Sequence, residues 1–577
     1  MNIISKYKLF LCGVAALAVT SCDDFLDQMP DERVEIKTEE QVVKLLTTAY
    51  TTGNYGWLCE LTSDNVIDIQ SPYYAVQSGG DEIRVYYNLT SYGREDDEAF
   101  RFEPVRSSTS QDSPSQIWEG CYNAIAVANH ALECIERIKT DNGGTMTPVL
   151  KAAYGEALLT RAFHHFILVN VFSQAWKNEE ASKADKGIPY VTKRGTNLIQ
   201  VYERSTVADT YAKIEQDLEE GLANISDINF KKPKWHFNVN AAHAFAARFY
   251  LYKRNYEKVI EHANAVLGED YSALPAMLMD YSGFDDCTSS TDYAEIWQGP
   301  NEPNNLMLIS TVSTQWRRTV GHRYACAGSA LRDIEYHLGP NWSFYLMPAA
   351  GVSGGTFWDG NSDHGFASAR IAERFEYTDK VAGIGFAHLI RREFTATELL
   401  LERAEAYLIG RSDWESCEKD IMAYEESRQS FSPENKAFYS QGMRPLTRDD
   451  IEKYYKDPKK CNVLASWDFT QNMDPNFVVP KNYEYYMNCI NDMRRYETAY
   501  TGHRFFDLKR WGMEWSHTYG NAESSTTVTL AWNDPRRAIE VPQEVLAAGL
   551  ESSHAPVIVK KGSSYGRYTA GIPVYKK

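Results

Sequence analysis

Hydrophobic residues recur at spacings of three and four along much of the chain, a pattern typical of amphipathic helices. The pattern is clear over residues 115–138 and 149–172, and one face of the first segment carries Trp118, Tyr122, Ile125 and Asn129. Ser115 suits an N-cap, and the glycines and proline of "DNGGTMTP" interrupt the pattern between the segments. We therefore expect an antiparallel helix pair here.

Two further segments, residues 204–267 and 395–428, repeat this organisation. In the first, alanines precede the sequence "NYEK" and a second helical stretch follows, which resembles a tetratricopeptide helix pair. In the second, a turn is expected at Gly410. The copies do not recur at the tetratricopeptide interval of about 34 residues, so helix pairs separated by insertions are expected. The predicted fold is mostly α, a tetratricopeptide-like scaffold over about residues 35–60, 115–270, 393–430 and 485–515.

Residues 71–114 and 270–390 lack helical periodicity and are rich in Gly, Ser, Asn and aromatic residues, with "EIRVYYNLT" at 82–90 as a strand candidate. Loops of this length are usually functional or disordered, and so many aromatic residues argue against disorder. Exposed rings with polar neighbours can stack on the apolar faces of sugars, and 13% of the chain is aromatic. The ligand-contacting residues predicted in these insertions are Tyr73, Tyr74, Tyr92, Trp316, Trp342 and Trp358.

Trp316 and Trp342 are the preferred pair among these aromatic residues. Gln315, Arg317 and Arg318 flank the first ring, and the second lies between Asn341 and Ser343. Such polar neighbours could bond sugar hydroxyls, whereas a tryptophan in a core seldom has charged neighbours. For any one of these aromatics, burial in a local core is the competing interpretation.

The N-terminal 21 residues have the three parts of a secretory signal: a basic start, an apolar stretch from Leu9 to Val19, and small residues before Cys22. The stretch is too short to span a bilayer as a helix. The sequence from Val19 to Cys22 resembles the bacterial lipobox, which implies a lipid attached to Cys22 and a mature domain over 22–577, held on a membrane by its acyl chains. An ordinary cleaved signal with an unmodified Cys22 is the alternative. Three aspartates that follow resemble the tag of surface lipoproteins of Bacteroidetes: Asp23, Asp24 and Asp27.

The formal charge of -18 becomes -20 when the two lysines of the signal, Lys6 and Lys8, are removed. An acidic surface repels nucleic acid and anionic lipid, so neither is expected as a partner. Eight cysteines remain beyond Cys12 and Cys22, without a CxxC pair or zinc-ligand spacing, so no metal site is predicted. Most are expected to be small core residues, and an exported protein could pair some of them.

The segment "NDMRRYETAYTGHRFFDLKRWG", residues 491–512, is the most specific internal pattern. On a helix, Arg504, Asp507 and Arg510 could form a charge ladder while Phe506 and Trp511 pack inward. Arginine does not act as a base, and an aspartate paired with arginine stays ionised. This pattern therefore predicts a structural role.

Together these segments resemble the SusD/RagB family of surface glycan-binding lipoproteins of Bacteroidetes. The matching pieces occur in the family's order: the lipobox, "ELTSDNV" at 60–66, Trp118 and Tyr122, "EALLTRAF" at 156–163, "RAEAYL" at 403–408 and "GHRFFDLKRWG" at 502–512. The chain departs from the family at Met493, where an acidic residue is usual, and in the loosely matching "EVPQEVLAAGL" near the C-terminus.

The resemblance implies a helical scaffold whose insertions form a ligand-binding face. It also implies an outer-membrane lipoprotein that faces the cell exterior, captures oligosaccharides and delivers them to a SusC-like TonB-dependent transporter. No catalysis and no cofactor are implied. A different class, a helical adaptor that holds a peptide or protein cargo on its helix pairs, remains open. Aromatics concentrated in the insertions favour sugar binding over that alternative.

A hydrolase is the third hypothesis. "GVSGG" at 351–355 matches the G-x-S-x-G pattern, but it lacks the preceding strand and following helix that a nucleophile elbow needs. "GIG" at 383–385 lacks the third glycine of a dinucleotide loop. His164 and His165 are adjacent on an expected helix and so point to different faces, which favours packing or exposure over metal ligation. A pair of glycosidase carboxylates would be visible only in space.

Overall fold

A computed structural model of the chain describes residues 36–71, 73–76, 82–85, 92–105, 110–193, 202–287, 289–319, 322–326, 334, 340, 356–358, 366–428, 446–456, 473–521 and 523–554. The signal segment, Cys22, Trp342, Cys461 and the "GVSGG" sequence lie outside these residues.

The described part of the chain is mostly α-helical, as the periodicity predicts. Its helices are α3 (Glu39–Leu46), α4 (Gly56–Leu61), α5 (Arg94–Phe100), α6 (Pro114–Asp141), α7 (Pro148–Phe172), α8 (Glu179–Ser182), α9 (Val207–Leu222), α10 (Val239–Tyr252), α11 (Tyr256–Leu267), α12 (Ser290–Trp297), α13 (Gln315–Thr319), α15 (Ala396–Arg411), α16 (Trp414–Arg428), α18 (Arg448–Lys456), α19 (Glu484–Glu497), α20 (His503–Trp511) and α21 (Gln543–Ala547). No helix in these residues is both long and apolar enough to cross a membrane.

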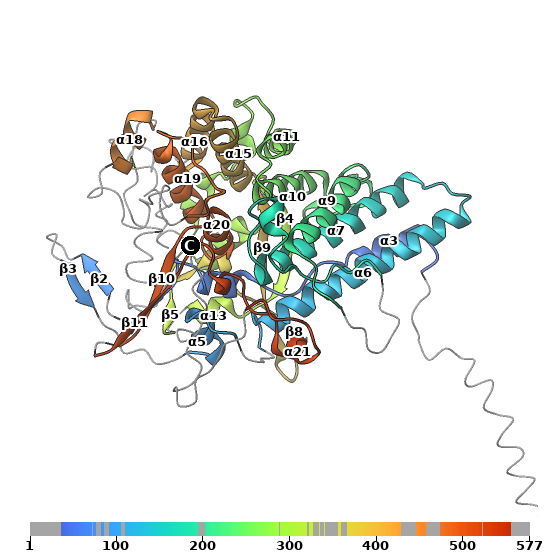
Figure 1. Ribbon diagram of the computed structural model, residues 1–577. Coiled ribbons are helices and arrows are strands. Elements are labelled where there is room, and N and C mark those ends of the chain that lie inside the picture. The colour runs from blue at the N-terminus through green and yellow to red at the C-terminus, as the bar shows by residue number, and fades with distance from the viewer. Residues whose placement is uncertain are drawn as a thin grey trace, which may run out of the picture.

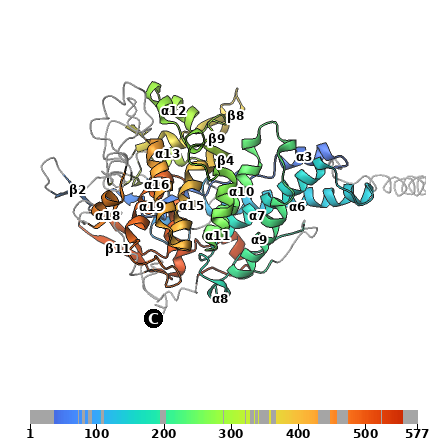
Figure 2. The same cartoon turned by 90° about the horizontal axis from the view of Figure 1, so that it is seen from above.

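The long helices form an array in which neighbours in sequence pack as pairs: α6 on α7, α10 on α11, and α15 on α16. Contacts of α7 with α9 and of α11 with α15 join the pairs into a row that runs across Figures 1 and 2. A large hydrophobic core lies between these helices, and a smaller one lies where α3 covers the pair α6–α7. The expected helix pairs are therefore confirmed in the residues described.

Two helix boundaries differ from the prediction. Helix α6 begins after Ser113, whose hydroxyl accepts a hydrogen bond from the Gln116 amide, and not after Ser115. Pro114 explains the earlier start, because its fixed φ and missing N–H suit the first position of a helix. The turn predicted at Gly410 lies at Ser412, which adopts a left-handed conformation after α15.

The strands lie mainly in the segments predicted as loop-rich insertions. They are β1 (Ile67–Asp68), β2 (Tyr73–Val76), β3 (Glu82–Val85), β4 (Asn305–Val312), β5 (Tyr324–Ala325), β6 (Thr356–Trp358), β7 (Phe366–Ser368), β8 (Arg374–Asp379), β9 (Ile384–Thr395), β10 (Trp515–Gly520) and β11 (Ser525–Leu530). Among the described residues, the antiparallel sheet β4–β9–β8 is the largest, and the other strands there form two-stranded sheets.

Strand β9 leads without a loop into α15, where Thr395 is the N-cap. The inner half of β9 is buried and pairs with β4, which fixes this sheet against the helical array. The "GIG" sequence lies at the turn of the β8–β9 hairpin, where Gly383 has a φ of 67°. It is a hairpin turn and not a dinucleotide loop.

Buried ion pairs hold the C-terminal motif against the array. Asp507 accepts hydrogen bonds from Arg494 at 2.9 Å and from Arg510 at 2.7 Å, and Arg510 also bonds Glu405 of α15 at 2.6 Å. The predicted ladder is therefore only half formed, because Arg504 turns to Asp64 instead. Phe506 and Trp511 pack inward as predicted. The segment has a structural role, since it ties α15, α19 and α20 together.

Candidate functional site

The predicted aromatic residues occupy several elements of the structure. Trp342 lies outside the described residues. Tyr73 and Tyr74 lie on β2, which pairs with β3, and Figures 1 and 2 show this hairpin at the outer end of the molecule, away from α13. Trp358 ends β6, which pairs with β7. Trp316 lies on α13, and Tyr92 lies two positions before Arg94, the first residue of α5.

Three of these positions come together through contacts between their elements. Helix α13, which carries Trp316, contacts both β7 and β5. Strand β7 pairs with the strand of Trp358. Tyr92 lies edge-on to Tyr324 of β5, with ring centroids 6.0 Å apart. Segments that are more than 200 residues apart in sequence therefore meet around β5, and this group of elements is called the β5 face below.

Tyr92 is the clearest exposed aromatic of the β5 face, with 43% of its surface accessible. The guanidinium of Arg323 lies 5.4 Å from the centre of its ring. Arg323 is held in turn by Asp68, to which it donates hydrogen bonds of 2.9 and 2.7 Å. The tyrosine ring is thus in contact with a fixed cation and an aromatic neighbour, while 43% of its surface stays accessible to solvent.

Trp316 is half-buried and packs against a small cluster that includes Leu389 and Tyr500. Its polar neighbours are already engaged within the protein. Gln315 is buried and donates to the carbonyl of Tyr500 at 2.7 Å, whereas Arg317 forms an ion pair with Glu373. The expectation that these neighbours would serve sugar hydroxyls is therefore wrong for Gln315, because burial removes it from any ligand.

Buried carboxylates fix the loops that carry the β5 face. Arg318 donates to Asp96 at 3.1 Å, and the indole of Trp57 donates to the same carboxylate at 2.9 Å. Asp112 accepts hydrogen bonds from Asn54 at 2.7 Å and from Ser313 at 2.6 Å. Burial raises the pKa of both Asp96 and Asp112 above the ordinary value. The sequence did not point to these residues, because their partners lie far away along the chain.

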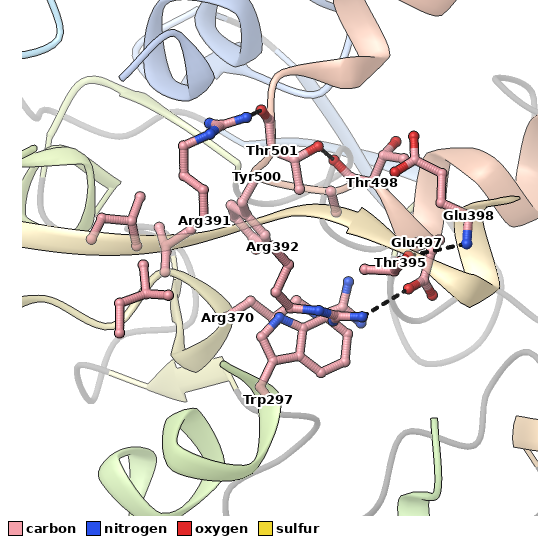
Figure 3. Close-up of a pocket in the computed structure, with 14 residues that line it drawn as sticks. Trp297, Arg370, Arg391, Arg392, Thr395, Glu398, Glu497, Thr498, Tyr500 and Thr501 are labelled. Atoms are coloured by element: carbon pink, nitrogen blue, oxygen red, sulfur yellow. Dashed lines mark hydrogen bonds and ion pairs between the residues drawn. The ribbon is translucent and has the colours of Figure 1, made fainter. Parts of the chain in front are cut away.

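A second polar cluster surrounds a cavity between β9, α12 and the end of α19 (Figure 3). Arg391 and Arg392 are consecutive on β9 and point apart: the first donates to Thr501, and the second lies 3.7 Å from the Trp297 ring centre, beside Glu497. The cavity volume is about 40 Å³, which accommodates water molecules but no sugar ring. This cluster is part of the interior.

The predicted histidine pair is buried and structural. Each ring accepts a backbone N–H through Nε2, from Thr51 for His164 and from Val191 for His165. Burial lowers the pKa of His164 to about 4 and that of His165 to about 3, so both are neutral near pH 7.

Two features of the described ranges bear on metal binding and disulfide pairing. Within them, no group of three or more His, Cys, Asp or Glu side chains is placed to hold a metal ion. The seven cysteines that these ranges contain are buried.

Comparison with known proteins adds independent information. Residues 24–251 match the family model SusD-like_3, described as "Starch-binding associating with outer membrane". No curated protein matches the sequence.

Solved structures match over nearly the full length. A putative sugar-binding protein from Bacteroides vulgatus is 14% identical, with 90% of this chain and 99% of that chain covered and a TM-score of 0.58. SusD superfamily proteins from Bacteroides fragilis and Bacteroides thetaiotaomicron are 16% and 15% identical, with TM-scores of 0.53 and 0.52. They cover 88% and 89% of this chain and 97% and 98% of their own. At these identities the likeness shows a shared fold. The family model covers residues 24–251, less than half of the chain, and the solved structures share its fold over nearly the whole length, so the chain is similar to SusD-like proteins.

Proposed function

We propose that this protein is a surface lipoprotein that binds oligosaccharides and delivers them to a SusC-like TonB-dependent transporter in the outer membrane. The family model that residues 24–251 match is described as starch-binding and associated with the outer membrane, which supports this proposal. So does its structural similarity to a protein described as sugar-binding. In this proposal the lipid on Cys22 holds the protein to the membrane, and no chemical step is performed.

The observation that carries the proposal is the β5 face. It presents an exposed ring, Tyr92, on rigid support, and Trp316 and the strand of Trp358 lie on elements around it. Carbohydrate sites combine such rings with fixed polar groups, because the apolar face of a sugar stacks on the ring while its hydroxyls form hydrogen bonds. Tyr73 and Tyr74 lie on the separate β2–β3 hairpin.

Isothermal titration calorimetry tests the proposal, with malto-oligosaccharides as the first members of a glycan panel. Once a ligand is found, Tyr92→Ala is expected to lower the affinity by about 1–3 kcal/mol. Tyr202→Ala is the matched control, because Tyr202 is 38% exposed and lies outside the β5 face. Equal affinities of Tyr92→Ala and the wild type would remove Tyr92 from the site. Release of reducing sugar from the panel would show a hydrolase and refute a purely binding function.

A further inference from the structure

A groove with a volume of about 1060 Å³ lies between helix α16 and the segment of residues 271–280. One wall is α16, and the other is formed by the turn η3 (Leu274–Ala276) with the residues that follow it. Figure 1 shows α15 and α16 beside α11 at one end of the helical row. The volume is at the upper end of the range for ligand pockets and suits a short peptide segment.

The wall formed by α16 is one continuous face of that helix. The residues that line the groove recur at helical spacing: Glu415, Glu418, Lys419, Met422, Ala423, Glu426 and Ser427. They cover slightly more than three turns, or about 18 Å at 1.5 Å per residue. A groove of this length, parallel to a helix, matches the mode in which an amphipathic segment lies along a helical groove.

The floor of the groove is apolar and its rim is acidic. Leu274, Leu278 and Met279 are buried, and the half-buried Met422 and Ala423 face them from α16. Methionine side chains adapt their shape to different apolar partners. The charged lining residues are four carboxylates and one ammonium: Asp280, Glu415, Glu418, Glu426 and Lys419.

Hydrogen bonds hold the two walls at a fixed separation. Tyr271, at the start of the η3 wall, donates to Asp420 of α16 at 2.7 Å. Arg403 of α15 bonds the same carboxylate at 2.7 and 3.0 Å. Because Asp420 and Arg403 are buried, the groove is formed before any ligand arrives. Preformed walls reduce the entropy cost of binding.

We propose that this groove docks a basic, amphipathic segment of a partner protein. Its apolar side chains would fill the floor, and its Lys or Arg residues would face the carboxylates of Glu415, Glu418 and Glu426. A sugar fits less well, because the floor is aliphatic and methionine-rich and Tyr271 is its single aromatic lining residue among those described. This second site is separate from the proposed glycan-binding face.

The probe is a fluorescein-labelled 14-residue peptide of Lys and Leu at helical spacing, and its matched control replaces every Lys by Glu. Fluorescence anisotropy is expected to show binding of the Lys peptide and none of the Glu peptide. Glu415→Lys/Glu418→Lys/Glu426→Lys should weaken binding at least tenfold. Glu119→Lys/Glu133→Lys/Glu136→Lys, which reverses three exposed charges on α6, should change it less than twofold. Equal losses in the two triple variants would show general charge attraction and overturn the proposal.

Ala423→Glu distinguishes docking in the groove from general charge attraction. The larger side chain fills part of the groove, and the added carboxylate makes the protein more acidic. Docking predicts at least fivefold weaker binding, whereas general attraction predicts unchanged or tighter binding, which would overturn the proposal. A measurement on the wild type does not depend on the folding of any variant: a benzophenone in the peptide should cross-link to the half-buried Met422, as detected by mass spectrometry. Cross-links elsewhere, or displacement of the peptide by a bound oligosaccharide, would also overturn it. The peptide-binding results do not depend on the glycan test, because a loss of glycan binding in Tyr92→Ala would leave peptide binding unchanged.

Discussion

Arg504 donates two hydrogen bonds to the carboxylate of Asp64, 2.7 Å from Nε and 2.8 Å from Nη2, across 440 positions of sequence. Both side chains are buried, and Arg504 also donates to Asn491 at 2.6 Å. Burial alone would raise the pKa of Asp64, but the guanidinium groups of Arg504 and Arg495 outweigh it and hold the pKa at about 2. Two of the sequence segments that resemble the family, residues 60–66 and 502–512, are thus joined by one ion pair.

Replacing Arg504 by lysine is expected to destabilise the protein strongly. Lysine cannot reproduce the two-pronged contact, and part of the Asp64 charge would remain buried without compensation. We expect the free energy of unfolding in urea to fall by about 3 kcal/mol. Arg411→Lys is the control, because its contact with Glu257 has the same form but lies at the surface. Similar losses of unfolding free energy in both variants would contradict the explanation that burial makes the Arg504–Asp64 ion pair important.

Acid is expected to weaken the fold through His164 and His165. Their pKa values in the folded protein, about 4 and about 3, lie below the ordinary value of 6.5. The unfolded chain therefore takes up protons first as the pH falls, and stability present above pH 6.5 is lost toward pH 4. His164→Gln/His165→Gln should flatten this part of the curve of unfolding free energy against pH. Parallel curves for variant and wild type would refute the assignment.

Lys509 is expected to make the free energy of unfolding depend on pH above neutrality. Burial lowers the pKa of Lys509 to about 7, although Nζ lies against the carbonyl oxygens of Asn170 and Ser173. The unfolded chain binds the extra proton between pH 7 and about 10.5, so this group makes stability rise with pH in that window. Relative to Lys509→Met, the wild type should gain stability between pH 7 and pH 9.5. Chemical unfolding at both pH values measures the difference, and a constant difference would contradict it.

Trp316→Ala tests whether this ring only packs in the protein or also stacks on a bound sugar. Its contact with the cluster around Leu389 and Tyr500 predicts a loss of about 1–3 kcal/mol in unfolding free energy. A stacking role predicts an additional loss of affinity of about 1–3 kcal/mol for the cognate oligosaccharide. Calorimetry on the folded variant decides, and wild-type affinity would assign Trp316 to the cluster alone. Trp342→Ala is the companion variant, and it should lose affinity with little loss of stability.

Cys22→Ala is expected to give a folded protein that is no longer anchored. The reason is that the sequence before Cys22 resembles a lipobox, and two acyl chains are needed for stable attachment. Fractionation of expressing cells measures the change, with circular dichroism as the control for folding. Tight retention of the variant in the membrane pellet would show that another element anchors the protein.

The helix pairs could be predicted because their information is local. Three- and four-residue spacing predicts helices that lie close to their positions in the structure. The turns predicted at "NYEK" and at the glycines between the first two long helices are also close to where the structure has them. Boundaries were less accurate where capping residues competed, as Ser113 and Ser115 do. The sheet β4–β9–β8 was not predicted, because pairing between residues about 80 positions apart leaves a weak mark on a single sequence.

The sequence by itself determined the helical scaffold, the apolar faces of its helices, the signal-like N-terminus and the residue types available for binding. Only the tertiary structure decided which charge each buried arginine meets: Arg504 pairs with Asp64 although Asp507 is three positions away. It also decided that Gln315 is buried whereas Tyr92 is exposed. Periodicity is a property of neighbouring residues, whereas a charge partner or an exposed ring depends on which distant segments exclude water from it.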